Sequence, residues 1–179
     1  PRAGVGAPLA AIVHVADIMA HEAGAAPGLG SFAIRMDETA IEKAGTSPLA
    51  GAFRRINAMR DPASIAPVLA WMHGHGVGGG FTFFVAADDK DSTTEIARVY
   101  QGGLGLPERD YYLRTDDASR LLREKYVAHI TRIFELAGDG HGSAKNAAAR
   151  VVALETKLAE ASKRLVDLRD PVANYHKMK

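Results

Sequence analysis

The sequence has no cysteine and only one tryptophan among its 179 residues. The lack of cysteine excludes a disulfide framework and a thiolate metal site, and it removes any redox evidence on the compartment. Charge of one sign is not in excess either, because 22 lysines and arginines are interspersed with 21 aspartates and glutamates, for a net charge of +1. This balance gives no reason to expect nucleic acid or an anionic membrane as a partner.

Long apolar runs are also lacking, so the sequence predicts no transmembrane helix and no secretory leader. Pro1-Arg2 stands where an initiator methionine would be, which indicates that the chain opens within a longer protein. The length fits one domain of about 100–200 residues. A chain of this size would bury on the order of 70% of its extended surface, and its apolar fraction of 47% is that of a globular protein.

The hydrophobic pattern predicts a mainly α fold, a multi-helix domain with one β-hairpin. Apolar residues at three-four spacing, with Asp or Ser caps and Pro at first helical positions, favour helices along most of the chain. The predicted helices run over residues 9–22 and 37–45, from 48 past 56, from 62 to 72, over 117–137 and over 143–165, and a last one begins at Asp170-Pro171. A glycine-rich break at 73–80 precedes the hairpin, predicted at about residues 81–101 with its turn at 88–92.

The two long helices near the end of the sequence each carry an apolar stripe. We expect both stripes to face a core rather than a cofactor groove. The stripes comprise Leu122, Tyr126, Ile130, Ile133 and Phe134 in the first helix, and Val151, Leu154, Leu158, Ala161 and Leu165 in the second.

The most particular stretch is residues 102–112, which read GGLGLPERDYY and which we call the connector. Three glycines and a proline within six residues predict a tight, irregular path with backbone angles that glycine accepts most easily. Two tyrosines and an Arg-Asp pair then follow, ready to fix that path by packing and hydrogen bonding. We expect Arg109 and Asp110 to brace the connector, the alternative being an approach to substrate. The predicted structural residues are Gly102, Gly103, Gly105, Pro107, Arg109, Asp110, Tyr111 and Tyr112.

Three further blocks of sequence resemble the same protein family as the connector does. They are residues 36–45 (MDETAIEKAG), residues 88–93 (DDKDST), and Arg169-Asp170-Pro171 followed by residues 174–178 (NYHKM). Together the four blocks resemble the neprilysin-like zinc metallopeptidases, which include endothelin-converting enzyme and bacterial oligopeptidases. The blocks follow the family's order over roughly residues 31–179, with His176 where Asn is usual, and the first thirty residues match loosely. Arg169 and Asp170 read as a brace at a helix start.

The resemblance implies a larger two-lobed helical enzyme, in which a glutamate deprotonates a zinc-bound water inside an enclosed cavity. The family's zinc motif, His-Glu-x-x-His, lies downstream of the blocks and needs two imidazoles one helical turn apart. Here the only His-Glu pair is His21-Glu22, and Ala25 stands where the second histidine would be. We therefore expect residues 1–179 to be the N-terminal portion alone, forming cavity wall and scaffold. It would be inactive by itself, without catalytic residues or metal ligands, with zinc bound only in the full-length enzyme.

Few residues are candidates for binding. The resemblance implies an N-terminal arginine that recognises the free carboxylate of a short peptide, and Arg2 is the candidate by position, the alternative being a frayed terminal residue. His73 and His75 form a His-x-His pair, which can chelate a divalent metal through two ligands, although no carboxylate is near in sequence to complete a site. His14, Asp17 and His21 share a helical face, which we interpret as an exposed polar surface. We interpret His129 as a hydrogen-bonded residue at the core edge.

The sequence leaves two alternatives. The chain can be a stand-alone, non-catalytic helical module that binds peptides or a protein, or an inactive fragment of a larger protein. The expected partners are peptide substrates of the full-length enzyme and the missing C-terminal catalytic region, with a dimer possible through exposed apolar surface. The resemblance is closer to the bacterial branch of the family, because the vertebrate members are rich in disulfides. It suggests the bacterial cell envelope, the periplasm or secretion.

Overall fold

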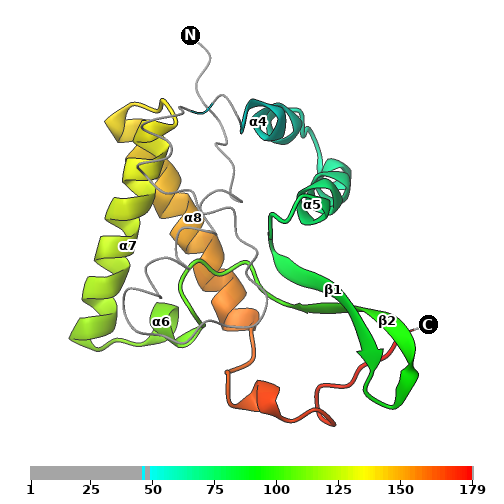
Figure 1. The fold of residues 1–179 in the computed structure, drawn as a ribbon. Helices are drawn as coiled ribbons and strands as arrows, with labels where there is room; N and C mark the ends of the chain where they lie inside the picture. Colours follow the sequence, from blue (N-terminus) through cyan, green and yellow to red (C-terminus); the bar gives the residue numbers. More distant parts are fainter. Residues whose placement is uncertain (1–45, 47–48, 179) are drawn as a thin grey trace.

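The computed structural model describes residue 46 and residues 49–178. This part of the chain is mainly helical with one antiparallel hairpin, which confirms the predicted fold class (Figure 1). The elements are α4 (Ala50–Asn57), the 3-10 helix η2 (Pro62–Ser64), α5 (Ile65–Gly74), β1 (Phe81–Asp88), β2 (Asp91–Gln101), α6 (Asp110–Leu113), α7 (Asp117–Leu136), α8 (His141–Ala161) and the 3-10 helix η3 (Asp167–Arg169). The helices predicted over residues 9–22 and 37–45 lie outside the described residues.

Helices α4 and α5 precede the hairpin. The entry to η2 and α5 is fixed by a reciprocal capping box, in which the Asp61 carboxylate accepts the Ser64 N–H at 2.9 Å. Pro62 follows at the first helical position, as its fixed φ and missing N–H favour. Among the described residues, no helix combines the length and the apolar character that crossing a membrane requires.

Helices α7 and α8 lie side by side and contain the core (Figure 1). The start of α7 is capped by Asp116, whose carboxylate accepts the Ser119 N–H at 3.0 Å. Tyr126, Ile130 and Phe134 are fully or almost fully buried, as the stripe of the first long helix predicts. They pack on a face of α8 made largely of alanine, so the large side chains of the interface come from α7 and the small ones from α8.

The predicted stripe of α8 is confirmed at Val151, which is buried, but wrong at its exposed members, and the helix ends at Ala161 rather than near residue 165. Leu154 is 42% exposed, and Leu165 lies beyond the helix and is 55% exposed. The reason is the division of volume across the interface: α7 fills the space with bulky side chains, so α8 approaches with its smallest residues. The buried face of α8 consists of Ala144, Ala147, Ala148, Val151, Glu155 and Ala159.

The hairpin projects away from the helical pair (Figure 1). Its register pairs Phe81 with Gln101 at the open end, and a bulge between Ala87 and Asp88 precedes the turn. The hairpin spans residues 81–101 as predicted, but both strands extend into the predicted turn at 88–92, so the turn is shorter than expected. Only one side chain of the two strands is buried, and it is that of Asp88.

The predicted helix at Asp170-Pro171 does not form; residues 171–174 make a turn instead. The Asp170 carboxylate accepts the N–H groups of Val172 and Ala173, both at 3.0 Å. The Asn174 side-chain amide donates to the carbonyls of Asp167 and Asp170. The bonds from Val172 and Ala173 are those of a helix N-cap, and the Asn174 N–H donates to the Asp170 carbonyl at 3.2 Å, as in a first helical turn. The Asn174 side chain competes for the same carbonyl, and the chain forms this one turn without a helix.

The segment after α8 runs along the hairpin. At one end, the Gln101 side chain bonds both the N–H and the carbonyl of Lys163, at 2.9 and 3.0 Å. At the other end, Lys177 Nζ lies 2.6 Å from the Asp88 carboxylate and the Tyr175 hydroxyl lies 3.2 Å from it. Residues 163–177 are therefore tied to both ends of β1 and β2.

Candidate functional site: the connector and its buried anchor

The connector begins with backbone packed on backbone. Gly103 has a φ of +79°, and a Cβ on it would stand 2.8 Å from the Cα of Gly80 at the start of the hairpin. Left-handed backbone and this contact both require glycine. The entry of the connector is thereby packed against the residue that precedes β1, at the open end of the hairpin.

Gly105 is required for a different reason, the approach of the connector to α7. A Cβ at this position would lie 1.8 Å from the Tyr126 hydroxyl oxygen and 3.0 Å from Glu155 Oε1. The next residue, Leu106, is 2% exposed and belongs to the core. Glycine is thus needed at Gly105 for close packing, whereas Gly103 also needs it for its positive φ.

A buried hydrogen-bond network fixes the middle of the connector. The Tyr112 hydroxyl accepts the N–H groups of Gly105 and Leu106, at 3.0 and 2.7 Å, and donates to Glu155 Oε2 at 2.9 Å. The Tyr126 hydroxyl donates to the other oxygen, Glu155 Oε1, at 3.0 Å. Glu155 is 1% exposed. Its carboxyl group, from α8, therefore links the connector, α6 and α7 at a position that is shielded from water.

The electrostatics of this network follow from its burial. Desolvation raises the pKa of Glu155 to about 7, and the hydrogen bonds from Tyr112 and Tyr126 oppose that rise. Burial, and then the charge of Glu155, raise the pKa of both tyrosines well above the ordinary value. Both hydroxyls therefore stay protonated and remain donors, while the carboxyl group titrates near neutrality.

The end of the connector is held by arginines. Arg109 Nε donates to the carbonyl of Ala159 in the last turn of α8, at 3.1 Å. Arg123 of α7 donates to the carbonyls of Tyr111 and Arg114, at 2.8 and 2.9 Å. Asp110 begins the single-turn helix α6, which the sequence pattern does not reveal. Arg109 thus braces the connector against the helical pair.

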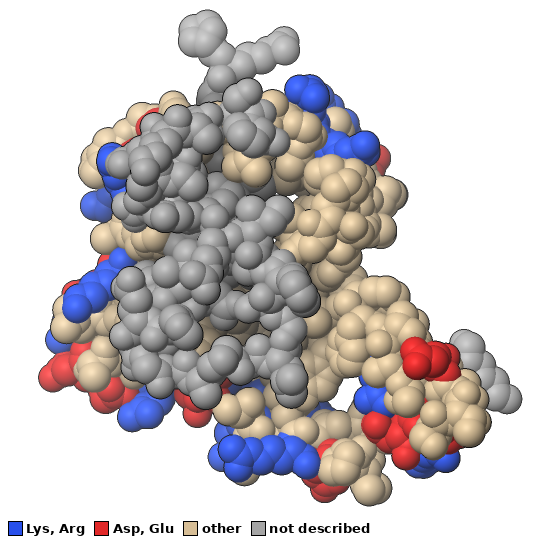
Figure 2. Space-filling view, viewed as in Figure 1, with Lys and Arg blue, Asp and Glu red and all other residues tan. Residues whose placement is uncertain are grey.

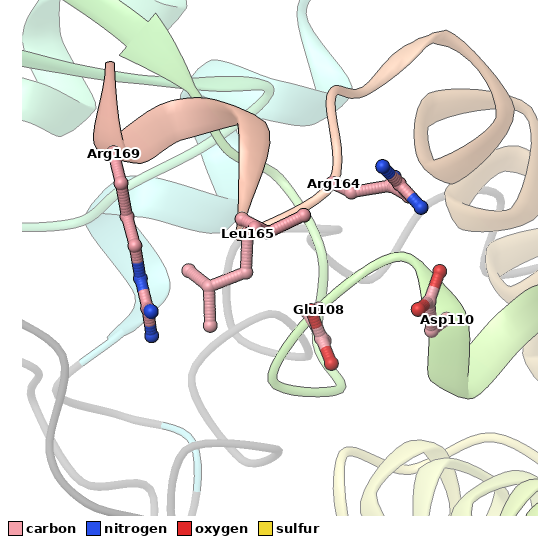
Figure 3. A pocket seen from close by; sticks show the side chains of 6 residues that line it. Glu108, Asp110, Arg164, Leu165 and Arg169 are labelled. Carbon is pink, nitrogen blue, oxygen red and sulfur yellow. The ribbon is translucent and has the colours of Figure 1, made fainter. Parts of the chain in front are cut away.

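A shallow pocket of about 280 Å³ opens where the connector faces the segment after α8 (Figure 3). Its carboxylates, Glu108 and Asp110, come from the connector, and its guanidinium groups come from Arg164 and Arg169. Arg164 is also paired with Asp167, at 3.1 and 3.2 Å. The structure therefore brings the connector and the Arg-Asp-Pro block together, although Pro107, Asp170 and Pro171 themselves are exposed.

The histidines of the described residues do not fit a zinc site. His73 stacks on Phe81 with ring centroids 4.9 Å apart, and His75 lies against Trp71, with Nδ1 2.7 Å from the Trp71 carbonyl. No group of three or more His, Cys, Asp or Glu side chains is placed to hold a metal ion in the described part of the chain. Arg2, His14, Asp17 and His21 lie outside the described residues.

Glu155 is not among the residues predicted from the sequence. It stands on the inner face of α8, four residues after Val151 and four before Ala159, both of which are buried. A carboxylate at a position where the three-four spacing demands an apolar side chain is the signal that reveals it, since buried acids need partners. The two tyrosines that donate hydrogen bonds to Glu155 lie 43 and 29 residues earlier in the chain.

The chain is similar to a known family and to several of its members. Residues 30–179 match the N-terminal model of Peptidase family M13. Neprilysin-3 of Drosophila melanogaster is 29% identical over 147 residues, which make up 77% of this chain and 19% of that protein. The endothelin-converting enzyme homolog of Locusta migratoria is 35% identical over 104 residues, or 58% of this chain and 14% of that protein.

A solved structure gives the same result for the fold. The crystal structure of the Mycobacterium tuberculosis zinc metalloprotease Zmp1 with an inhibitor superposes with a TM-score of 0.70 at 35% identity. The superposition covers 94% of this chain and 26% of Zmp1. The chain thus spans a quarter or less of the length of the curated relatives named above, and about a quarter of this solved one.

Proposed function

This chain belongs to Peptidase family M13, as the N-terminal portion of a neprilysin-like zinc metallopeptidase, and we propose that its role there is non-catalytic. In the proposal, the complete enzyme is a zinc-dependent endopeptidase that hydrolyses short peptides. The described residues form scaffold and part of the wall of its cavity. Their contribution is confinement and orientation of the peptide. A location in the bacterial envelope, the periplasm or the medium belongs to the same proposal.

The observation that carries the scaffold role is the number of independent anchors on the connector. Gly103 packs on the hairpin, Tyr112 is bonded to Glu155, and Arg109 is bonded to the end of α8. A loop held at its beginning, middle and end keeps one shape, which is what a wall around a reacting peptide needs. All three contacts hold the connector in place, which supports a scaffold role.

Zinc belongs to another part of the proposed enzyme. The chain has no His-Glu-x-x-His, and the histidine pair of the described residues is engaged with Phe81 and Trp71. These residues offer no set of three ligands of the kind that a catalytic zinc uses.

The test is the intact mass, zinc content and activity of the protein purified from its natural source. We expect a mass several times the 19.0 kDa of this chain, about one zinc per polypeptide, and hydrolysis of short peptides that a chelator stops and added zinc restores. Folded proteins should not be cleaved, because an enclosed cavity excludes them.

A different outcome would support the alternative of a binding module. In that case the native product would have a mass of 19.0 kDa, without zinc, and would bind short peptides without cleaving them. Binding can be followed by isothermal titration and cleavage by mass spectrometry on the same sample. Binding without cleavage at this mass would remove the peptidase proposal.

A further inference from the structure

One face of the hairpin is apolar and open to solvent. The register places Phe83 opposite Val99 and Val85 opposite Ala97, with side chains on the same face because they alternate along each strand. Phe83, Val85 and Val99 are 48%, 60% and 65% exposed. We call this surface the hairpin face; it consists of Phe83, Val85, Ala87, Ala97 and Val99.

The other face of the hairpin is partly covered, since Phe84 and Tyr100 on it are 40% and 41% exposed. Asp88, which lies on it, is bonded to Tyr175 and Lys177 of the segment after α8. In the view of Figure 2, the charged side chains of the hairpin gather at its turn and the stretch toward α5 is uncharged. A two-stranded sheet is marginal in water unless an apolar face is covered. The hairpin face is therefore built for an interface.

The size of the hairpin face decides between partners. Five side chains are far fewer than the roughly 20–30 residues a side of a stable complex between separate molecules. A contact within one polypeptide needs no such area, because the linked segment is already present at a high effective concentration. A chain continued from residue 178 would start beside the hairpin, because Tyr175 and Lys177 are held at Asp88. In Zmp1, about three quarters of the chain lies outside the superposed part.

We propose that the hairpin face docks onto the C-terminal part of the same peptidase, within one polypeptide. The inference rests on the proposed function, since it needs a longer enzyme. It adds a definite interface between the two parts, centred on Phe83, Val85 and Val99. Its chemistry predicts an apolar complementary surface, because Glu95 at the rim is the single charged residue among the pairs of this face.

Photo-crosslinking of the complete protein tests this interface. A photoreactive phenylalanine analogue replaces Val85 on the hairpin face, and the same analogue replaces the exposed Ser92 beside the turn as a matched control. Mass spectrometry then maps the crosslinked peptides. We expect residue 85 to crosslink to residues beyond 179 of its own polypeptide, with a yield several-fold above that of residue 92.

Three outcomes would overturn the proposal: crosslinks between two copies, crosslinks to residues 1–45, or equal low yields at both positions. Zinc content and peptide hydrolysis are measured on the same samples. An active zinc peptidase with one of these patterns would contradict the docking inference alone. A 19.0 kDa protein without zinc and without hydrolysis would contradict the proposed function and, with it, the docking inference.

Discussion

The helical pair and the hairpin differ in what they bury. The core around α7 and α8 holds aromatic and aliphatic side chains of α7, alanines of α8 and a single carboxyl group, that of Glu155. The two strands of the hairpin bury no apolar side chain, and their one buried residue is Asp88. The helical pair therefore contains its own source of stability, whereas the hairpin depends on an ion pair and on surfaces outside itself.

The two buried acids also respond to pH in opposite directions. Burial raises the pKa of Glu155 to about 7, whereas the hydrogen bond from Lys177, with the N–H of Lys90, lowers the pKa of Asp88 to about 2. When folding raises the pKa of an acid, the stability that its protonated form gives is lost as the pH rises through that pKa. When folding lowers the pKa of an acid, the stability that its ionised form gives is lost as the pH falls through that pKa. The helical pair should therefore become less stable toward neutral pH, and the contact of Asp88 with Lys177 and Tyr175 should weaken in acid.

The largest expected effect is that of Gly105→Ala. The new Cβ would stand 1.8 Å from the Tyr126 hydroxyl oxygen, so the connector or α7 must shift and the Glu155 network must break. We expect the free energy of unfolding to fall by on the order of 4 kcal/mol, at the upper end for single substitutions. Urea denaturation followed by circular dichroism measures it.

Gly142→Ala is the matched control for this substitution. Gly142 lies in α8, and its added methyl group would meet nothing within 4 Å. Alanine should be neutral or stabilising there by about 0.5–1 kcal/mol. Equal effects of the two substitutions would show that the close packing of the connector on α7 is absent.

The pH dependence of the helical pair comes next. Because the pKa of Glu155 is raised from 4.5 to about 7, the free energy of unfolding should fall by up to about 3 kcal/mol as the pH rises between these values. Glu155→Gln should flatten this slope, because the amide does not titrate and still offers an acceptor and a donor to the two hydroxyls. Glu160→Gln, at an exposed position of the same helix, should leave the slope in place; a slope unaffected by Glu155→Gln would assign it to another group.

Tyr112→Phe and Tyr126→Phe divide the network between its two hydroxyls. Loss of the Tyr112 hydroxyl leaves the N–H groups of Gly105 and Leu106 without their acceptor and Glu155 Oε2 without its donor. We expect a loss of about 2–3 kcal/mol for Tyr112→Phe, against about 1 kcal/mol for Tyr126→Phe, which removes one bond. Thermal melting compares the two variants. A larger effect of Tyr126→Phe would place the anchor of the connector elsewhere.

The smallest effect concerns the hairpin and is local. Asp88→Asn removes the charge that holds Lys177, so the backbone amides of residues 174–178 should exchange hydrogen faster while those of α7 and α8 keep their rates. Asp89→Asn breaks the Arg98 pair within the hairpin and should leave residues 174–178 unchanged. Hydrogen-exchange mass spectrometry reads both regions at once. The same segment should loosen in the unsubstituted protein as the pH falls from 3.8 toward about 2.

Much of the local structure could be predicted from the sequence. Helix α7 has its cap at Asp116 and its stripe of Tyr126, Ile130 and Phe134 at regular spacing, and the hairpin alternates between turn signals. Such patterns depend on neighbours in the chain, which the sequence displays. The C-terminal turn is the local exception: Asp170 caps it as it would cap a helix, but the Asn174 side chain competes for the Asp170 carbonyl and no helix follows.

The sequence by itself determined the family, the succession of α4, α5, the hairpin, α7 and α8, and the special character of the connector. Only the tertiary structure decided which face of α8 is buried, that Glu155 anchors the connector, and that Asp88 holds residues 175–177. The physical reason is that these features join residues tens of positions apart. Packing volume and the desolvation of a carboxyl group depend on what meets in space, and a one-dimensional pattern does not contain that information.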